Sequence, residues 1–147
     1  MKFRIYLLSL MACLLSSARM MADDTPITSV PFDQTTLTTG QYRIPSLVRI
    51  DSKTLIAFAD LRSGSGDVGA TDGHTSIVAK KSVDNGATWG EQITILDASK
   101  QSDANFKYGD AATVYAPDSN KILLMCCGGT VAYGSSTKDN PLRTYMA

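Results

Sequence analysis

The sequence predicts an all-β fold built from short antiparallel strands joined in consecutive hairpins. Short runs rich in β-branched and aromatic residues recur along the chain, turn residues separate them at close intervals, and helical periodicity is absent. With 147 residues, 44% of them apolar, the chain can bury a core of ordinary size. The following paragraphs take the predicted elements in chain order.

The first four β-rich runs predict one four-stranded meander. They cover residues 46–50, 54–59, 75–82 and 89–96. Turn residues join each run to the next, with Asp, Ser and Lys at 51–53, a Gly-rich stretch at 63–73, and Asp84-Asn85-Gly86. Because every connection turns the chain back on itself, neighbouring strands should pair antiparallel.

A second meander begins at residues 111–115, turns at 117–120 and continues through 121–127. Consecutive four-stranded meanders build β-propellers, and one or two blades alone would leave apolar faces and strand edges uncovered. We therefore predict part of a β-propeller over residues 41–147, with its second blade unfinished.

Charged residues should gather at one end of this sheet. If the first strand descends from Arg43, the second climbs to Arg62, and hairpin pairing brings the two arginines together. The Gly-rich loop with Asp67 lies at the same end, and so does Asp110, where the next descending strand starts. Such residues could form a ligand site, or pair on a polar rim at a gain of only about 0–1 kcal/mol.

The N-terminus predicts export. Residues 1–22 combine basic Lys2 and Arg4 with a short apolar run and small residues suited to cleavage, so we interpret them as a signal peptide and expect a periplasmic or extracellular protein. The run is too short for a lasting transmembrane helix. Residues 10–13 resemble a lipobox, which leaves a lipid anchor at Cys13, as in an outer-membrane lipoprotein, as the alternative. Residues 23–40 should form an extended leading segment.

Charge and composition exclude several partner classes. Fourteen basic and fourteen acidic residues give zero net charge, so we expect no binding to nucleic acid. Cys126 and Cys127 are adjacent and should point to opposite faces of a strand, as small apolar side chains rather than a disulfide or metal site. His74 is the only histidine and is interpreted as a loop residue without metal partners.

Two motifs resemble those of the sialidases. Tyr42-Arg43-Ile44-Pro45 is similar to the Phe/Tyr-Arg-Ile-Pro motif of this family, and residues 82–89 fill each position of its Asp box, Ser-x-Asp-x-Gly-x-Thr-Trp. The residues of the Asp box are Ser82, Asp84, Gly86, Thr88 and Trp89. Their role should be structural, because Asp84 can accept backbone N–H bonds, Gly86 can take a positive φ and Trp89 can pack beneath the turn. The resemblance is good over residues 41–115 and weak beyond.

The resemblance implies a six-bladed propeller and roles for four residues. Arg43 would grip the carboxylate of sialic acid, for which a planar guanidinium is well suited. Arg62 and Asp110 would bind other substituents of the sugar, although the family commonly has Pro where Ala111 stands, so a structural role for Asp110 stays open. Asp67 would be the proton donor, and we favour it over Asp72, which precedes a glycine as in an ordinary turn.

The implied activity is that of a retaining exo-α-sialidase, which releases terminal sialic acid from glycans without metal or cofactor. Sialidases use a tyrosine nucleophile. That tyrosine, its glutamate partner and two further arginines would come from later blades, so the chain alone should be inactive. Two alternatives remain, namely a propeller that binds glycans without catalysis and a trans-sialidase.

Overall fold

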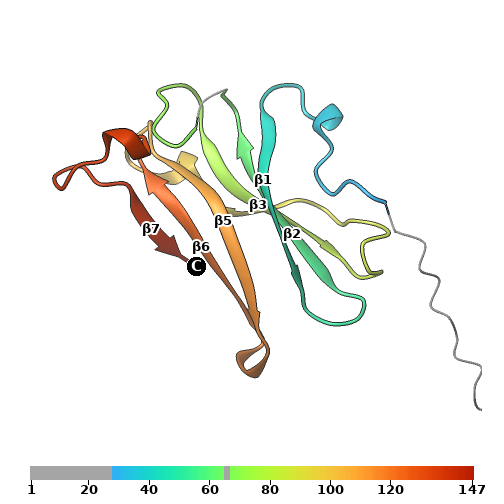
Figure 1. Ribbon diagram of the computed structural model, residues 1–147. Coiled ribbons are helices and arrows are strands. Elements are labelled where there is room, and N and C mark those ends of the chain that lie inside the picture. The colour runs from blue at the N-terminus through green and yellow to red at the C-terminus, as the bar shows by residue number, and fades with distance from the viewer. Residues whose placement is uncertain (1–27, 65–66) are drawn as a thin grey trace, which may run out of the picture.

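The computed structural model describes residues 28–64 and 67–147, which form two antiparallel β-sheets packed face to face (Figure 1). The predicted signal peptide and the lipobox at Cys13 lie outside the described residues. No helix in the described part is long and apolar enough to cross a membrane. The all-β prediction is confirmed, and helical structure in the same residues is limited to four 3₁₀ turns. These turns are η1 (Gln34–Thr36), η2 (Ala98–Lys100), η3 (Pro117–Ser119) and η4 (Tyr133–Ser135).

The first sheet is the predicted four-stranded meander. Its strands are β1 (Gln41–Arg49), β2 (Leu55–Arg62), β3 (Thr75–Ser82) and β4 (Ile93–Leu96), paired in the order β1-β2-β3-β4. The bounds of β3 are those predicted. By contrast, β1 and β2 extend further toward the end that carries the candidate site, and β4 begins four residues later than expected. The sequence 89–92 instead completes the turn that contains Trp89.

The second sheet has three strands, one more than the sequence predicted. These are β5 (Lys107–Ala116), β6 (Lys121–Gly129) and β7 (Arg143–Met146), in that order. The missed strand, β7, has only four residues and lies at the edge of its sheet. Such a short run carries little periodicity, so its pairing with β6 decides its structure.

The core lies between the two sheets. Phe58 and Ile77 from the first sheet are 4% and 0% exposed, and Leu124 and Cys126 from the second are 2% and 3% exposed. A ring cluster of Phe106, Tyr108 and Tyr145 closes one side of this core, with ring centroids 4.9–5.8 Å apart. Burial of these side chains holds the two sheets together at roughly 25 cal/mol per Å² of apolar surface.

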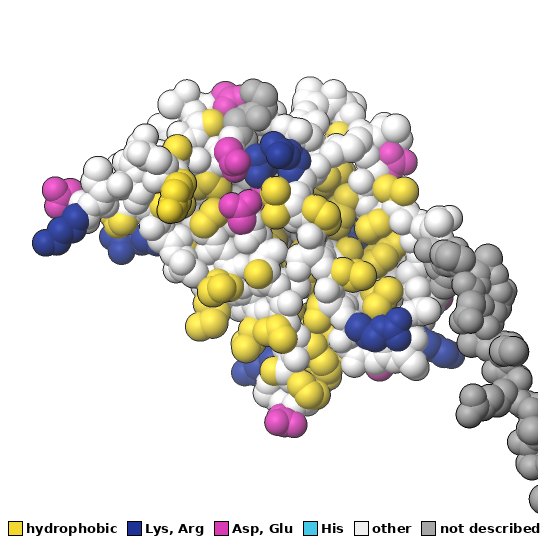
Figure 2. Space-filling model, viewed as in Figure 1, with side chains coloured by type: hydrophobic (Ala, Val, Ile, Leu, Met, Phe, Trp, Pro, Cys, Tyr) yellow, Lys and Arg dark blue, Asp and Glu magenta, His cyan; other side chains and the backbone are white. Residues whose placement is uncertain are grey.

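The faces directed away from this core are less covered. On the second sheet, Val114, Met125 and Met146 are 57%, 53% and 76% exposed and line a hollow of about 280 Å³. On the first sheet, Leu47 is 60% exposed. Hydrophobic side chains reach the surface over both sheets in the space-filling view (Figure 2). Two apolar outer faces are what propeller blades present to their neighbours.

Each sheet begins with a strand that bulges at the same place. The register of β1 with β2 shifts between Arg43 and Ser46, and that of β5 with β6 shifts between Gly109 and Ala112. Inside each bulge one residue has left-handed backbone, Ile44 with φ 51° and Asp110 with φ 60°. Non-glycine residues adopt this conformation rarely, and bulges are common beside active sites. Both bulges lie toward the end of the fold that carries the candidate site.

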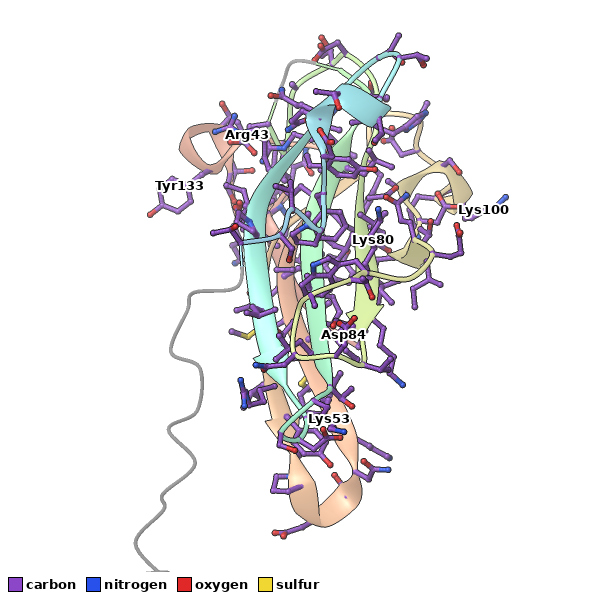
Figure 3. The ribbon with its side chains drawn as sticks, turned by 90° about the vertical axis from the view of Figure 1, so that its right-hand side faces the viewer. Arg43, Lys53, Lys80, Asp84, Lys100 and Tyr133 are labelled. Atoms are coloured by element: carbon purple, nitrogen blue, oxygen red, sulfur yellow. The ribbon has the colours of Figure 1, made fainter. Side chains whose placement is uncertain are left out.

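The turn around Asp84 has the geometry expected for it. The Asp84 carboxylate accepts hydrogen bonds from Ser82 Oγ at 2.7 Å, Thr88 N–H at 2.9 Å and Thr88 Oγ1 at 2.6 Å, while Gly86 has φ 91°. These hydrogen bonds lower the pKa of Asp84 to about 2. Asp84 and Lys53 lie toward the end of the molecule opposite Arg43 (Figure 3), so this turn is remote from the candidate site.

The described part of the leading segment, residues 28–40, includes the turn η1 and packs against the first sheet. Trp89 Nε1 donates to Ser29 Oγ at 2.9 Å, and Ser29 Oγ donates to the Gly86 carbonyl. Phe32 packs against Tyr42 with the two rings tilted and their centroids 5.0 Å apart. The segment therefore covers part of the face of the first sheet that lies away from the second.

Candidate active site

Arg43 lies near one end of β1 with its side chain exposed to solvent (Figure 3). It is the residue before the bulge, and its cross-strand partner on β2 is Asp60. Hairpin pairing brings Arg43 and Arg62 to the same end of the sheet, as expected, with Arg62 opposite Gln41. The bulge at Ile44 and Pro45 offsets the register, so the two arginines are diagonal neighbours on the same face of the sheet.

Arg62, at the end of β2, is fully buried, with 0% of its side chain exposed. Its Nη2 donates to Asp60 Oδ2 at 2.8 Å and lies 3.1 Å from Asp67 Oδ1. Burial alone would lower the pKa of Arg62, but the hydrogen bond and negative charge of Asp60 outweigh burial and leave that pKa raised. Arg62 is therefore a fixed cation between two carboxylates.

Asp67 follows the Gly-rich part of the loop between β2 and β3, and its side chain is 68% exposed. Besides facing Arg62, its Oδ1 accepts the N–H of Val68 at 2.8 Å. The far half of the same loop is held from the second sheet, where the buried Lys107 donates to the carbonyl of Asp72 and to that of Gly73 at 2.7 Å. Asp67 thus presents a solvent-facing carboxylate on a loop held at both ends.

Asp110 lies within the bulge of β5 and is exposed. Its backbone N–H donates to Asp60 Oδ1 at 3.1 Å, across the boundary between the sheets. The Cys127 thiol lies 3.2 Å from the Gly109 carbonyl and 3.4 Å from Asp110 Oδ2, where it can donate to either. The structure therefore brings Arg62, Asp67 and Asp110 to one end of the fold, as the sequence predicted, with Arg43 opposite Asp60 on the same face.

Sequence reasoning missed Asp60 and Lys107, which are 0% and 1% exposed. Burial raises the pKa of Asp60 to about 6, against the opposing influence of Arg62. A usable signal was present in the alternation of β2, since Asp60 has the same parity as Phe58 and Arg62 and so faces the core with them. A carboxylate at an inward position of a strand calls for a buried partner.

The other polar and sulfur residues weighed in the sequence have structural surroundings. Cys126 and Cys127 are free thiols, the first buried in the core as expected, the second half-buried beside Asp110. Burial raises the pKa of Cys126 to about 11 and of Cys127 to about 12, so neither thiol is activated. His74 lies in the loop before β3. Within the described ranges, no group of three His, Cys, Asp or Glu residues could hold a metal ion.

A hollow on the first sheet lies away from these residues. It has a volume of about 420 Å³ and is lined by Phe32, Leu47, Leu55 and Trp89, among others. Its lining includes neither Arg43, Arg62, Asp67 nor Asp110. The hollow is mostly apolar and lies between the leading segment and the outer face of the sheet, so convergent charge, rather than cavity size, marks the candidate site.

Comparison with known proteins gives a consistent result. A scan against protein-family models finds no match. A sialidase of Vibrio cholerae is 34% identical over 87 residues, which is 58% of this chain and 11% of that protein. The same match occurs in a second strain of that species. The chain therefore spans about a tenth of the length of these curated relatives.

Solved structures share the fold at lower identity. The Hadza microbial sialidase Hz136 aligns with a TM-score of 0.66 and 21% identity over 84% of this chain and 28% of that one. The NanB sialidase of Streptococcus pneumoniae aligns with a TM-score of 0.58 and 21% identity over 80% of this chain and 22% of that one. The intramolecular trans-sialidase of Ruminococcus gnavus aligns with a TM-score of 0.56 and 20% identity over 80% of this chain and 28% of that one.

The sequence match and the fold match point to the same family, and they agree with the motif resemblance at residues 42–45 and 82–89. Each relative is much longer than this chain, as expected if the two sheets correspond to part of a larger propeller. The chain is similar to sialidases in sequence over 87 of its residues, and its two sheets match part of the β-propeller of solved sialidases.

Proposed function

We propose that this chain supplies part of the active site of an exo-α-sialidase, which releases terminal sialic acid from glycans. The observation that carries the proposal is the exposed Asp67 carboxylate, 3.1 Å from a fully buried arginine at the end of the fold that also bears Asp110. Oppositely charged residues can pair at the rim of a protein without any function, but such pairs are ordinarily exposed, whereas Arg62 is buried.

The proposed roles follow the chemistry of the side chains. Arg43 is exposed and offers a planar fork of donors to the carboxylate of sialic acid, an interaction that contributes roughly 1.5–3 kcal/mol per charged hydrogen bond. Asp110 is exposed and contacts another substituent of the sugar. Arg62 was expected to contact the sugar as well, but its side chain is fully buried, so its role is to hold Asp67 by their ion pair. Asp67 gives its proton to the glycosidic oxygen as the bond to the anomeric carbon breaks, and later takes a proton from the attacking water.

The rest of the proposed machinery lies outside this chain. In a sialidase, a tyrosine activated by a glutamate attacks the anomeric carbon, so that its configuration is retained, and two more arginines complete the site for the carboxylate. Since the chain spans 11% of its curated relatives, we place these residues in later blades. Tyr108 and Tyr145 belong to the buried ring cluster, which supports a structural role for them.

The test is release of free sialic acid from 3′-sialyllactose by the full-length polypeptide that contains this chain. Asp67→Asn should lower kcat by about 10²–10⁴-fold, because the amide cannot donate a proton in the same way but still accepts the Val68 N–H. Asp103→Asn is the matched control, since the exposed Asp103 also accepts a backbone N–H, that of Asn105 at 2.9 Å. Binding of sialosides without cleavage by the wild-type protein would support a glycan-binding propeller instead.

A trans-sialidase is the second candidate, because intramolecular trans-sialidases of Ruminococcus gnavus and of leech share the fold with TM-scores of 0.56 and 0.57. Hydrolysis and intramolecular transfer give products that differ by one molecule of water. Mass spectrometry of the released sugar distinguishes them, and added lactose tests for transfer to an external acceptor.

We also propose export through the N-terminal signal at residues 1–22. Fractionation of cells that express the tagged full-length protein should place it outside the cytoplasm. Retention in the membrane fraction that is abolished by Cys13→Ala would favour the lipid anchor, and a soluble exported protein would favour cleavage after Ala18 or Ala22.

A further inference from the structure

The buried Asp60 carboxylate is in contact with groups from both sheets. Asp60 Oδ2 accepts Arg62 Nη2 at 2.8 Å, and Asp60 Oδ1 accepts the backbone N–H of Asp110 at 3.1 Å. Arg62 in turn lies 3.1 Å from Asp67. One fully buried side chain therefore connects three of the four candidate site residues, which come from β2, the following loop and β5.

The surroundings of Asp60 are shaped to admit this carboxylate. Its neighbours across the strands are Arg43 on β1 and Ile77 on β3, and Ile77 is fully buried. On the opposing sheet Gly109 comes so close that a Cβ there would lie 3.3 Å from Asp60 Oδ2. Any side chain at position 109 of β5 would crowd the Asp60 carboxylate. Because Gly109 has none, the carboxylate on the first sheet can approach β5 and accept the Asp110 N–H.

The burial of the Asp60 carboxylate costs free energy of hydration. Burial raises its pKa to about 6 even though Arg62 opposes that rise, which means that the ion pair does not fully offset the loss of hydration. Apolar residues of similar size often replace buried ion pairs without loss of stability. The cost is explained if the carboxylate serves the site rather than the core.

The left-handed backbone of Asp110 is a second observation that supports a role for Asp60 in the site. A non-glycine residue with φ 60° is strained and persists only where its surroundings hold it. The hydrogen bond from its N–H to Asp60 Oδ1 is one such restraint, and the contact of its carboxylate with Cys127 is another. Asp60 thus restrains two groups. One is the backbone of Asp110, which carries a site carboxylate, and the other is the guanidinium of Arg62, which is the cation of the site.

We propose that Asp60 is a positioning residue, which fixes the buried Arg62 on β2, and through it Asp67, relative to Asp110 on β5, so that the two exposed carboxylates can face the same sialic acid. This proposal rests on the proposed sialidase function. Only a carboxylate has two acceptor oxygens, one for the guanidinium of Arg62 and one for the backbone N–H of Asp110. An asparagine has one, and its amide nitrogen is a donor that cannot pair with the N–H of Asp110 or with Arg62.

The test is a double-mutant cycle on the full-length polypeptide that contains this chain, with kcat and KM measured on 3′-sialyllactose. Asp60→Asn keeps one acceptor oxygen and cannot accept hydrogen bonds from both Arg62 and the Asp110 N–H. KM should therefore rise about tenfold, the loss typical of a charged hydrogen bond. In an Arg62→Gln background the same change should raise KM less than about twofold, because the residue that Asp60 orients is already gone. Asp118→Asn, at an exposed turn, is the matched control and should leave both constants unchanged.

Circular dichroism and gel filtration establish that each variant is folded. If Asp60→Asn is not, Asp60→Glu takes its place, since it keeps both oxygens but displaces them by one methylene. KM should again rise, and the rise should again vanish beside Arg62→Gln. A purely structural role predicts instead that the two changes multiply.

The outcomes separate the two proposals. An active wild-type protein in which the Asp60 and Arg62 effects multiply would overturn the positioning role and leave the sialidase function intact. A wild-type protein that releases no sialic acid in any form would overturn both. A rise in KM that depends on Arg62 supports the positioning role.

Discussion

Gly109→Ala should destabilise the fold by crowding the junction between the two sheets. A Cβ at Gly109 would lie 2.8 Å from Val68 Cγ2 and 3.3 Å from Asp60 Oδ2. Carbon atoms pack at about 3.5–4.0 Å, so β5 or Val68 must move by roughly 0.7 Å or more. Val68 is β-branched and 6% exposed, which leaves it few other rotamers. Overpacking of this kind costs about 1–3 kcal/mol.

The same atomic change at Gly134 provides the control. A Cβ there has no neighbour within 4 Å. Both variants reduce the entropy of the unfolded chain, an effect of about 0.4–1 kcal/mol that favours folding. The difference in unfolding free energy between the two variants therefore isolates the contact at Gly109, and it should be about 1–3 kcal/mol.

Equilibrium unfolding in urea measures that difference. Trp89 is the only tryptophan in the 147-residue chain and lies half-buried in the Asp84 turn, so its fluorescence reports unfolding of the first sheet. Val68→Ala combined with Gly109→Ala should recover part of the loss, since the clashing methyl groups are removed. Equal stability of the Gly109→Ala and Gly134→Ala variants would refute the close packing of β5 against the loop.

Two further predictions concern stability. Phe58→Ala should lower the unfolding free energy by about 3–5 kcal/mol, because Phe58 is 4% exposed between the sheets, whereas Val83→Ala at a 63% exposed turn position should change it by less than about 0.5 kcal/mol; similar losses in both would contradict the location of the core. Asp84 has a pKa lowered to about 2, so its contribution to stability is present above its ordinary pKa of 3.8 and is lost as the pH falls through 2. Thermal melts between pH 5 and pH 2 should therefore fall less steeply for Asp84→Asn than for the wild type, and parallel curves would count against the hydrogen bonds of that turn.

Local chemistry accounts for what the sequence predicted well. The Asp84 turn depends on neighbours within a few residues, such as the Thr88 N–H four residues from Asp84. The hairpin connections likewise reverse the chain where Asp, Asn and Gly permit it. These features carry their own signal in the order of residues, because the groups that interact are close in the chain.

Register was less predictable than the strands themselves. The bulge in β1 moves the partner of Arg43 to Asp60 from Leu61, where the register of residues 46–49 would place it. The bulge in β5 gave Asp110 its left-handed backbone. An extra residue in a strand leaves no clear pattern in the sequence, because it is held by partners on the neighbouring strand.

The sequence by itself determined the fold class, the strand-turn order and the end of the sheet at which Arg62, Asp67 and Asp110 meet. Only the tertiary structure decided that Asp60 and Lys107 are buried, that β7 pairs with β6, and that one carboxylate joins the two sheets. The physical reason is distance along the chain. Asp60 and Asp110 are 50 residues apart, and Lys107 and Gly73 are 34 residues apart, so these contacts exist only once the sheets have packed.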